Sequence, residues 1–172
     1  MSDERRTAAP RLPDDERAMQ YALRVLGYCP RSISELRQRL EKKGCTPAIT
    51  DRTLAELARL GLLDDREFAQ SWVSHRQKQR GPALLRQELR RKGIDRDLAE
   101  EVITAEISAD SECTAAWQVA TRALRNDTFP PDRNALLRVR RLLQRRGFSF
   151  DVIGRVCARF STQLTADGEW LE

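Results

Sequence analysis

Arginine is the residue type with the clearest potential for chemistry in this chain. Segment 133–146 contains no acid and carries Arg133, Arg138, Arg140, Arg141, Arg145 and Arg146. Of these, Arg138, Arg141 and Arg145 recur at i, i+3 and i+7, which places them on one face of a helix, opposite Val139 and Leu143. Guanidinium groups bind phosphate and carboxylate through paired hydrogen bonds. A stripe of about 10 Å without a compensating acid favours an anionic partner, with a solvated surface as the alternative.

A second basic segment lies earlier in the chain. It contains Arg76, Lys78, Arg80, Arg86, Arg90, Arg91 and Lys92, and Glu88 is the acid within it. The segment that follows is acidic, with Asp95, Asp97, Glu100, Glu101 and Glu106. Both basic segments are therefore candidate partner-binding surfaces on units whose faces differ in charge.

The remaining polar residues give little support for catalysis or metal binding. The cluster Asp64, Asp65 and Glu67 precedes an apolar helical pattern, so it predicts a helix cap with acids at the positive end of the dipole rather than a cation site. His75 is the one histidine and is expected to be partly exposed. No phosphate-binding glycine loop or nucleophile motif is present. We therefore expect no enzymatic activity, no cofactor and no metal.

Cysteine spacing and overall charge indicate where the protein acts. Cys29, Cys45, Cys113 and Cys157 lie far apart without C-x-x-C spacing, which argues against zinc and is typical of a reducing cytoplasm. No apolar run reaches the roughly 18 residues of a membrane span, and residues 1–13 lack a secretion signal. The formal charge of +5 and the pI of about 9.4 suit an acidic partner. A cytoplasmic protein is expected.

A repeated phrase predicts how the helices are joined. LEKKGC at 40–45, LRRKGI at 89–94 and LLQRRGF at 142–148 each place cations and then glycine after a leucine. Leucine or valine stands four and eight positions before each glycine, which is the spacing of a buried helix face. The glycine supplies the left-handed residue just past the helix end, and Thr46, Asp95 and Ser149 are N-caps for the next helix.

These signals predict an all-helical protein. Helices are expected at about 14–28, 32–44, 47–61, from Asp64 onward, and at 82–93, 96–107, 111–126, 132–146 and 150–163, with a loop at 126–131. In groups of three they give tandem three-helix repeats at 14–61, 64–107 and 111–163, between tails at 1–13 and 164–172. Each repeat is small, so we expect neighbours to share packing in an elongated, curved array.

Four phrases together resemble the RecX family of regulators of the RecA recombinase. They are RSISELRQRLEKKG at 31–44, GLLDDREFA at 61–69, RGPALLRQELRRKGI at 80–94 and RRGFSFDVI at 145–153, and the resemblance covers about 18–160. Asp64, Asp65 and Phe68 match the family's acidic-aromatic motif. Segments 80–93 and 145–148 match its second-repeat and third-repeat motifs. Cys45 departs from the bulkier apolar residue expected after the first glycine.

The resemblance implies a bacterial, non-enzymatic protein of three tandem three-helix repeats. It implies binding to the RecA filament on single-stranded DNA, within the filament groove, with restraint of strand exchange, ATP hydrolysis and co-protease activity in DNA repair, recombination and the SOS response. Single-stranded or duplex DNA is a further expected partner through its phosphates, no membrane is involved, and a monomer is expected. Two alternatives stand beside it: a helix-turn-helix-like DNA-binding protein and a scaffold for an unrelated acidic protein.

Overall fold

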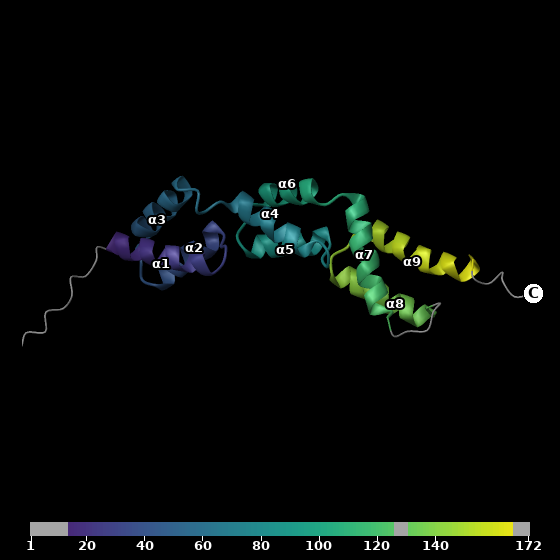
Figure 1. The fold of residues 1–172 in the computed structure, drawn as a ribbon. Coiled ribbons are helices and arrows are strands. Elements are labelled where there is room, and N and C mark those ends of the chain that lie inside the picture. Colours follow the sequence, from purple (N-terminus) through teal and green to yellow (C-terminus); the bar gives the residue numbers. More distant parts are fainter. Residues whose placement is uncertain (1–13, 126–130, 167–172) are drawn as a thin grey trace, which may run out of the picture. The chain divides into compact units, whose positions relative to one another are not determined.

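The computed structural model describes residues 14–125 and 131–166, with side chains up to Ser161. Within these residues the chain forms α-helices and no strands, which confirms the predicted fold class. The helices are α1 (Asp14–Tyr28), α2 (Ile33–Lys42), α3 (Pro47–Arg59), α4 (Asp65–Arg76), α5 (Pro82–Arg91), α6 (Arg96–Glu106), α7 (Ala109–Ala123), α8 (Arg133–Arg145) and α9 (Phe150–Ala166) (Figure 1).

The repeated glycine phrase ends α2, α5 and α8 in one geometry. Gly44, Gly93 and Gly147 have φ of 86°, 76° and 78°, the left-handed conformation that glycine adopts at least cost. The residue after each glycine donates its N–H to a leucine carbonyl of the last turn, at 3.1 Å for Cys45 and Ile94 and 3.2 Å for Phe148. These bonds satisfy carbonyls that the helix leaves unpaired, as the repeated phrase predicted.

Several helix boundaries differ from the sequence prediction by one to three residues. Helix α7 begins at Ala109, two residues before the expected Ser111, because Ser108 is the N-cap and its hydroxyl accepts from the N–H of Ser111 at 3.1 Å. Helix α9 continues to Ala166, so the tail predicted at 164–172 began too early. The predicted tail at 1–13 and residues 126–130 of the predicted loop lie outside the described residues.

The chain divides into two compact units, residues 1–65 and 66–172. In the first unit, α1, α2 and α3 pack pairwise around a core that includes Ala22, Leu36, Leu40 and Leu57, each fully buried. Asp65 closes this unit, since its carboxylate accepts from the N–H of Ile33 at the start of α2, at 2.8 Å.

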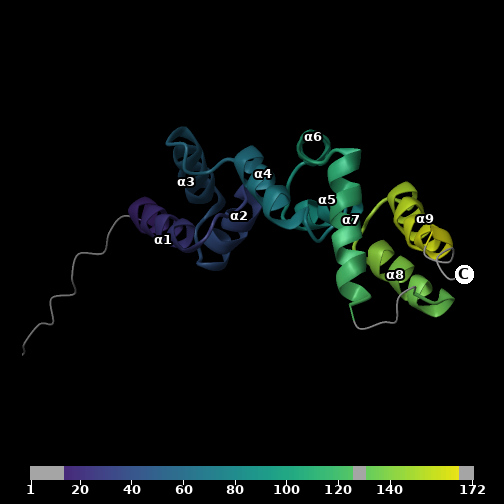
Figure 2. The same ribbon diagram turned by 45° about the vertical axis from the view of Figure 1, so that its right-hand side comes forward.

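The second unit contains two core clusters. Helices α4, α5 and α6 bury one cluster around Val73, Leu85 and Leu89, and α7, α8 and α9 bury another around Val139 and Leu143. Both views of the ribbon show α7 beside α8 and α9 (Figures 1 and 2). Each predicted repeat therefore has its own apolar core.

The second and third predicted repeats pack against each other at a joint within the second unit. Gly81 donates to the carbonyl of Arg146 at 2.8 Å, and Ala83 donates to the carbonyl of Gly147 at 3.1 Å. A Cβ on Gly81 would lie 2.3 Å from the carbonyl oxygen of Gly147. The absence of a side chain at Gly81 is therefore what allows the loop before α5 to lie directly on the hinge between α8 and α9.

Replacing a hinge glycine is expected to destabilise the fold. Gly93→Val should lower the free energy of unfolding by about 1 kcal/mol or more, because a β-branched residue resists the φ of 76° found at Gly93. Gly154→Val is a control, because Gly154 lies within α9 and an added Cβ would have no atom within 4 Å. Urea denaturation should show a clear loss for the first variant and little change for the second; equal midpoints would contradict the assignment.

Candidate interface for an anionic partner

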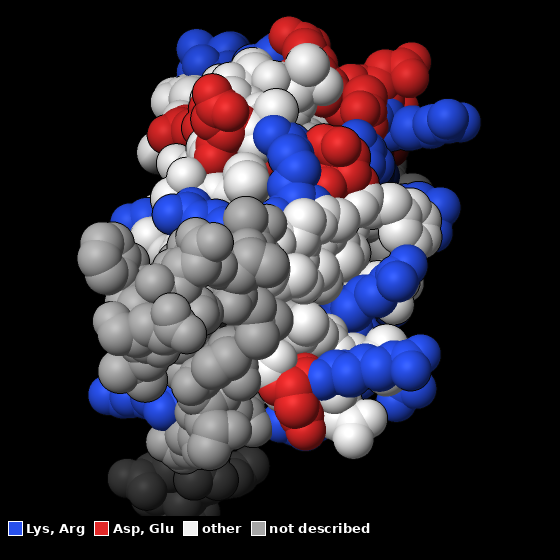
Figure 3. All heavy atoms as spheres, turned by 90° about the vertical axis from the view of Figure 1, so that its right-hand side faces the viewer, with Lys and Arg blue, Asp and Glu red and all other residues white. Residues whose placement is uncertain are grey.

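Helix α8 presents an arginine face to solvent. Val139 and Leu143 are buried against α7 and α9, and Arg138, Arg140, Arg141 and Arg145 are exposed. Helix α8 itself has no acidic residue, and its N-cap Asp132 uses its carboxylate to accept from the N–H of Ala135 at 2.6 Å. Figure 3 shows blue side chains around the lower part of this end of the molecule with little red among them.

An apolar side chain lies within the arginine face. Leu137 is 41% exposed, and it stands one turn from both Arg133 and Arg141 on α8. The sequence analysis did not identify Leu137. The helical spacing places this residue among the arginines and away from the core, so it could have been predicted from the sequence. A single exposed leucine is common on protein surfaces, so Leu137 adds an apolar group to the arginine face but does not by itself mark a binding surface.

The exposed arginines differ in whether a carboxylate of the protein forms an ion pair with them. Among the residues that the structure describes, no carboxylate lies within ion-pair distance of Arg140, Arg141 or Arg145. Arg90, Arg91 and Lys78, from the second predicted segment, are likewise exposed. These six side chains are available to an anionic partner without breaking an ion pair within the described part of the chain.

Three other predicted residues are held by acids of the protein. The carboxylate of Glu88, which is 8% exposed, accepts from the indole N–H of Trp72 at 2.9 Å and forms ion pairs with Arg76 at 4.0 Å and with Arg80. Arg86 binds the carboxylate of Glu100 on α6 through two contacts of 2.5 and 2.8 Å.

These ion pairs correct part of the sequence interpretation, in which Glu88 was the sole acid opposing the second basic segment. The acid that faces Arg86 comes from the next helix, α6, where the sequence placed a separate acidic face. The side-chain hydrogen bond from Arg86 lowers the pKa of the Glu100 carboxyl.

Stacking on Trp72 adds a second constraint. The guanidinium of Arg76 lies 3.8 Å from the centre of the Trp72 ring, and the ammonium of Lys92 lies 4.7 Å from it. Trp72 also stacks on Phe68, with ring centroids 5.7 Å apart. Cations over an indole face are attracted by its negative potential, so Arg76 and Lys92 are positioned by the fold itself.

The joint between α5 and α8 brings cations from both predicted segments together. The guanidinium of Arg146 donates to the carbonyl of Gln79 at 3.2 Å, so this residue belongs to the joint rather than to the arginine face. Burial, followed by the charges of Arg76 and Arg146, lowers the pKa of Arg80 from its usual high value. Glu88 is therefore the acid that stabilises a local concentration of positive charge.

The acidic-aromatic motif residues Asp64, Asp65 and Phe68 lie at the start of α4 and in the core beneath it. Helix α4 begins directly after Asp64, as the cap prediction required, and Phe68 is buried in the α4–α6 core. Burial raises the pKa of Asp65, while the hydrogen bond from Ile33 acts in the opposite direction. The sequence predicted Asp65 as a cap acid for α4 but could not show its contact with the start of α2.

The described residues offer little for metal binding or membrane insertion. They contain no group of three potential metal ligands, and none of their helices is both long enough and apolar enough to cross a bilayer. The ring nitrogen Nδ1 of His75 lies 2.7 Å from the carbonyl of Ser71, on an exposed part of α4. All four cysteines are free thiols.

Neutralising Glu88 is expected to destabilise the second unit. Glu88→Gln should lower the free energy of unfolding by about 1–3 kcal/mol, since Arg76 and Arg80 would lose a nearly buried carboxylate partner but keep partial access to water. Glu100→Gln is the matched control at an exposed pair, where a loss below about 1 kcal/mol is expected. Chemical denaturation monitored through tryptophan fluorescence measures both; equal effects would show that Glu88 has no special role.

Comparisons with known proteins identify relatives of this chain. Family models for the first and second three-helix domains of RecX match residues 18–57 and 64–103. The chain is 34% identical over 158 residues to a regulatory protein RecX of Mycobacterium avium, covering 90% of this chain and 89% of that protein. It is also 34% identical to a regulatory protein RecX of Halorhodospira halophila, over 80% of this chain and 84% of that protein.

Solved structures show the same fold. The crystal structure of RecX from Lactobacillus salivarius aligns with a TM-score of 0.75 at 22% identity, covering 87% of this chain and 97% of that one. The helices and their repeated hinges thus define a protein built from tandem three-helix repeats, as the sequence predicted. The chain belongs to the RecX family, which confirms the resemblance seen in its four phrases.

Proposed function

We propose that this chain is a non-enzymatic cytoplasmic regulator that binds the RecA filament on DNA and restrains its strand exchange, ATP hydrolysis and co-protease activity. Membership of the RecX family supports RecA as the partner. The observation that carries the mode of binding is the acid-free, exposed arginine face of α8. A protein–DNA filament offers both phosphates and acidic side chains to such a face.

The two groups of basic residues have different roles in this proposal. Arg138, Arg140, Arg141 and Arg145 of α8 contact the partner, together with Lys78, Arg90 and Arg91 of the α4–α5 segment. The residues bound to Glu88, Glu100 or the Gln79 carbonyl position these surfaces, and they are Arg76, Arg80, Arg86 and Arg146. Contacts of modest strength at both surfaces add up when they act on one polymer.

Addition of the purified chain to RecA assembled on single-stranded DNA tests the proposal. We expect ATP hydrolysis and strand exchange to fall as the chain approaches the concentration of RecA. A matched reaction with RecA-free DNA separates an effect on the filament from coating of the DNA. Unchanged hydrolysis and exchange in stoichiometric excess of the chain would contradict the proposal.

Sequence-specific binding to duplex DNA is the second candidate function. The observation in its favour is that α8 lies in a three-helix unit with arginines along its exposed face, as a groove-binding helix would require. Binding to one defined duplex that survives raised salt would support it. Binding that is lost uniformly for all duplexes as salt rises would indicate phosphate contacts alone.

A further inference from the structure

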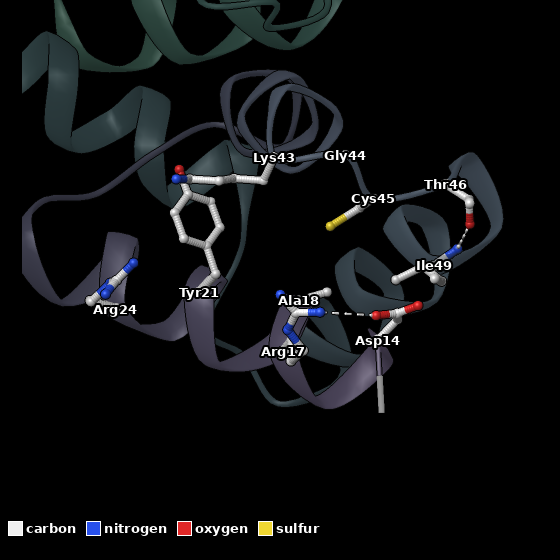
Figure 4. Close-up of a pocket in the computed structure, with 10 residues that line it drawn as sticks. All are labelled: Asp14, Arg17, Ala18, Tyr21, Arg24, Lys43, Gly44, Cys45, Thr46 and Ile49. Carbon is white, nitrogen blue, oxygen red and sulfur yellow. Dashed lines mark hydrogen bonds and ion pairs between the residues drawn. The ribbon is translucent and has the colours of Figure 1, made fainter. Parts of the chain in front are cut away.

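The first unit contains a pocket that none of the arginine surfaces above includes. It has a volume of about 290 Å³ and lies between α1, the hinge after α2 and the start of α3. Its apolar wall includes Ala18, Tyr21, Cys45 and Ile49 (Figure 4). We propose that this pocket binds an acidic peptide segment through an apolar side chain inserted between these residues.

Cys45 lines the pocket at a hinge position where the other two repeats have larger apolar residues. At the equivalent hinge position, the second and third repeats have Ile94 and Phe148, which are 4% and 5% exposed and fill their own cores. Cys45 is only partly buried, and its sulfur points into the space between α1 and α3 (Figure 4). The departure from the bulky residue that the family pattern predicts therefore leaves room for a side chain from another molecule.

Positive charge surrounds the opening. The ammonium of Lys43 lies 5.4 Å from the centre of the Tyr21 ring, and the guanidinium of Arg24 lies 5.6 Å from it. Among the described residues, no carboxylate is within ion-pair distance of Lys43 or Arg24. Arg17 also lines the pocket, but Asp14 pairs with it at 3.3 Å. Two uncompensated cations beside an apolar space suit a segment in which carboxylates flank an aliphatic residue.

The same features favour a peptide over a nucleic acid strand. A stacked base needs an open aromatic face, whereas cations already lie near the Tyr21 ring. Ala18, Cys45 and Ile49 give the pocket an apolar wall that accommodates a leucine side chain.

Fluorescence anisotropy with the full chain tests this inference without RecA or DNA. The labelled peptide is acetyl-Glu-Asp-Leu-Asp-Glu-amide, and the matched peptide carries serine in place of leucine. We expect saturable binding of the leucine peptide and at least about tenfold weaker binding of the serine peptide, because the apolar contact is lost. Because the assay contains no RecA, its failure would leave the proposed regulation untouched.

Two variants of the protein locate the binding. Cys45→Phe should fill the pocket and weaken peptide binding at least about tenfold, while the denaturation midpoint is retained because Phe148 occupies the equivalent position in the third repeat. Arg24→Glu combined with Lys43→Glu should have an effect of similar size by reversing the charge at the opening.

The control reverses two exposed cations that lie outside the pocket, Arg39 and Lys42, which are on the same unit. Arg39→Glu combined with Lys42→Glu should change peptide binding by less than threefold or so, which separates a local contact from net charge. Equal affinity of the leucine and serine peptides, full binding by folded Cys45→Phe, or displacement of the peptide by oligothymidylate at the same site would overturn the inference.

Discussion

Reversing the charge of Arg138, Arg141 and Arg145 to glutamate is expected to weaken binding to RecA on single-stranded DNA by about 100-fold. Each reversal replaces an attraction with a repulsion at the exposed face of α8, and three changes of roughly 1 kcal/mol each combine to that factor. Co-sedimentation with the filament at fixed salt measures the loss. Inhibition of ATP hydrolysis should weaken in parallel.

Two controls accompany this triple variant. Lysine at the same three positions keeps the charge and should retain binding to within a few-fold, since the face acts mainly through its positive potential. Circular dichroism should show unchanged helical content for both variants, because all three side chains are exposed. Full inhibition by the glutamate variant would remove the α8 face from the interface, whatever the lysine variant did.

Introducing a methyl group at the joint of the second unit is expected to have the largest effect on stability. Gly81→Ala places a Cβ 2.3 Å from the Gly147 oxygen and 2.3 Å from the Phe148 nitrogen, and both contacts involve backbone that cannot rotate away. A loss of about 3 kcal/mol or more in the free energy of unfolding is expected from such overpacking. The loop before α5 must then separate from the hinge between α8 and α9.

Gly27→Ala is the matched control for the joint. Gly27 is in α1, and no atom lies within 4 Å of the position of an added Cβ, so alanine should stabilise the helix by about 0.5–1 kcal/mol. Opposite signs for the two substitutions in urea denaturation would establish the close approach at Gly81. A small effect of Gly81→Ala would mean that the loop and the hinge are not in contact in solution.

Local sequence signals predicted the helices well because those signals act within one or two turns. Ser32 accepts from the N–H of Glu35 at 3.1 Å, and Asp95 accepts from the N–H of Asp97 at 2.9 Å, as their cap positions required. Gly93 adopts its left-handed conformation because the helix before it ends there. Such residues need no knowledge of the rest of the fold.

Local signals could not predict which arginines are already bound to other groups of the protein. Arg86 and Glu100 are separated by 14 residues, and Arg146 and Gln79 by 67, so both contacts depend on how helices pack. Composition identified the basic segments but not which guanidinium groups are already paired. The pocket is a similar case, because Cys45 was visible as a departure from the pattern whereas the cations around Tyr21 come from α1 and the hinge after α2.

Electron microscopy of the chain bound to RecA filaments, formed on single-stranded DNA with a non-hydrolysable nucleotide, tests the central claim most directly. We expect added density along the filament in which the arginine face of α8 points toward RecA or the DNA phosphates. Filaments without added density, or density in which that face points to solvent, would contradict the account.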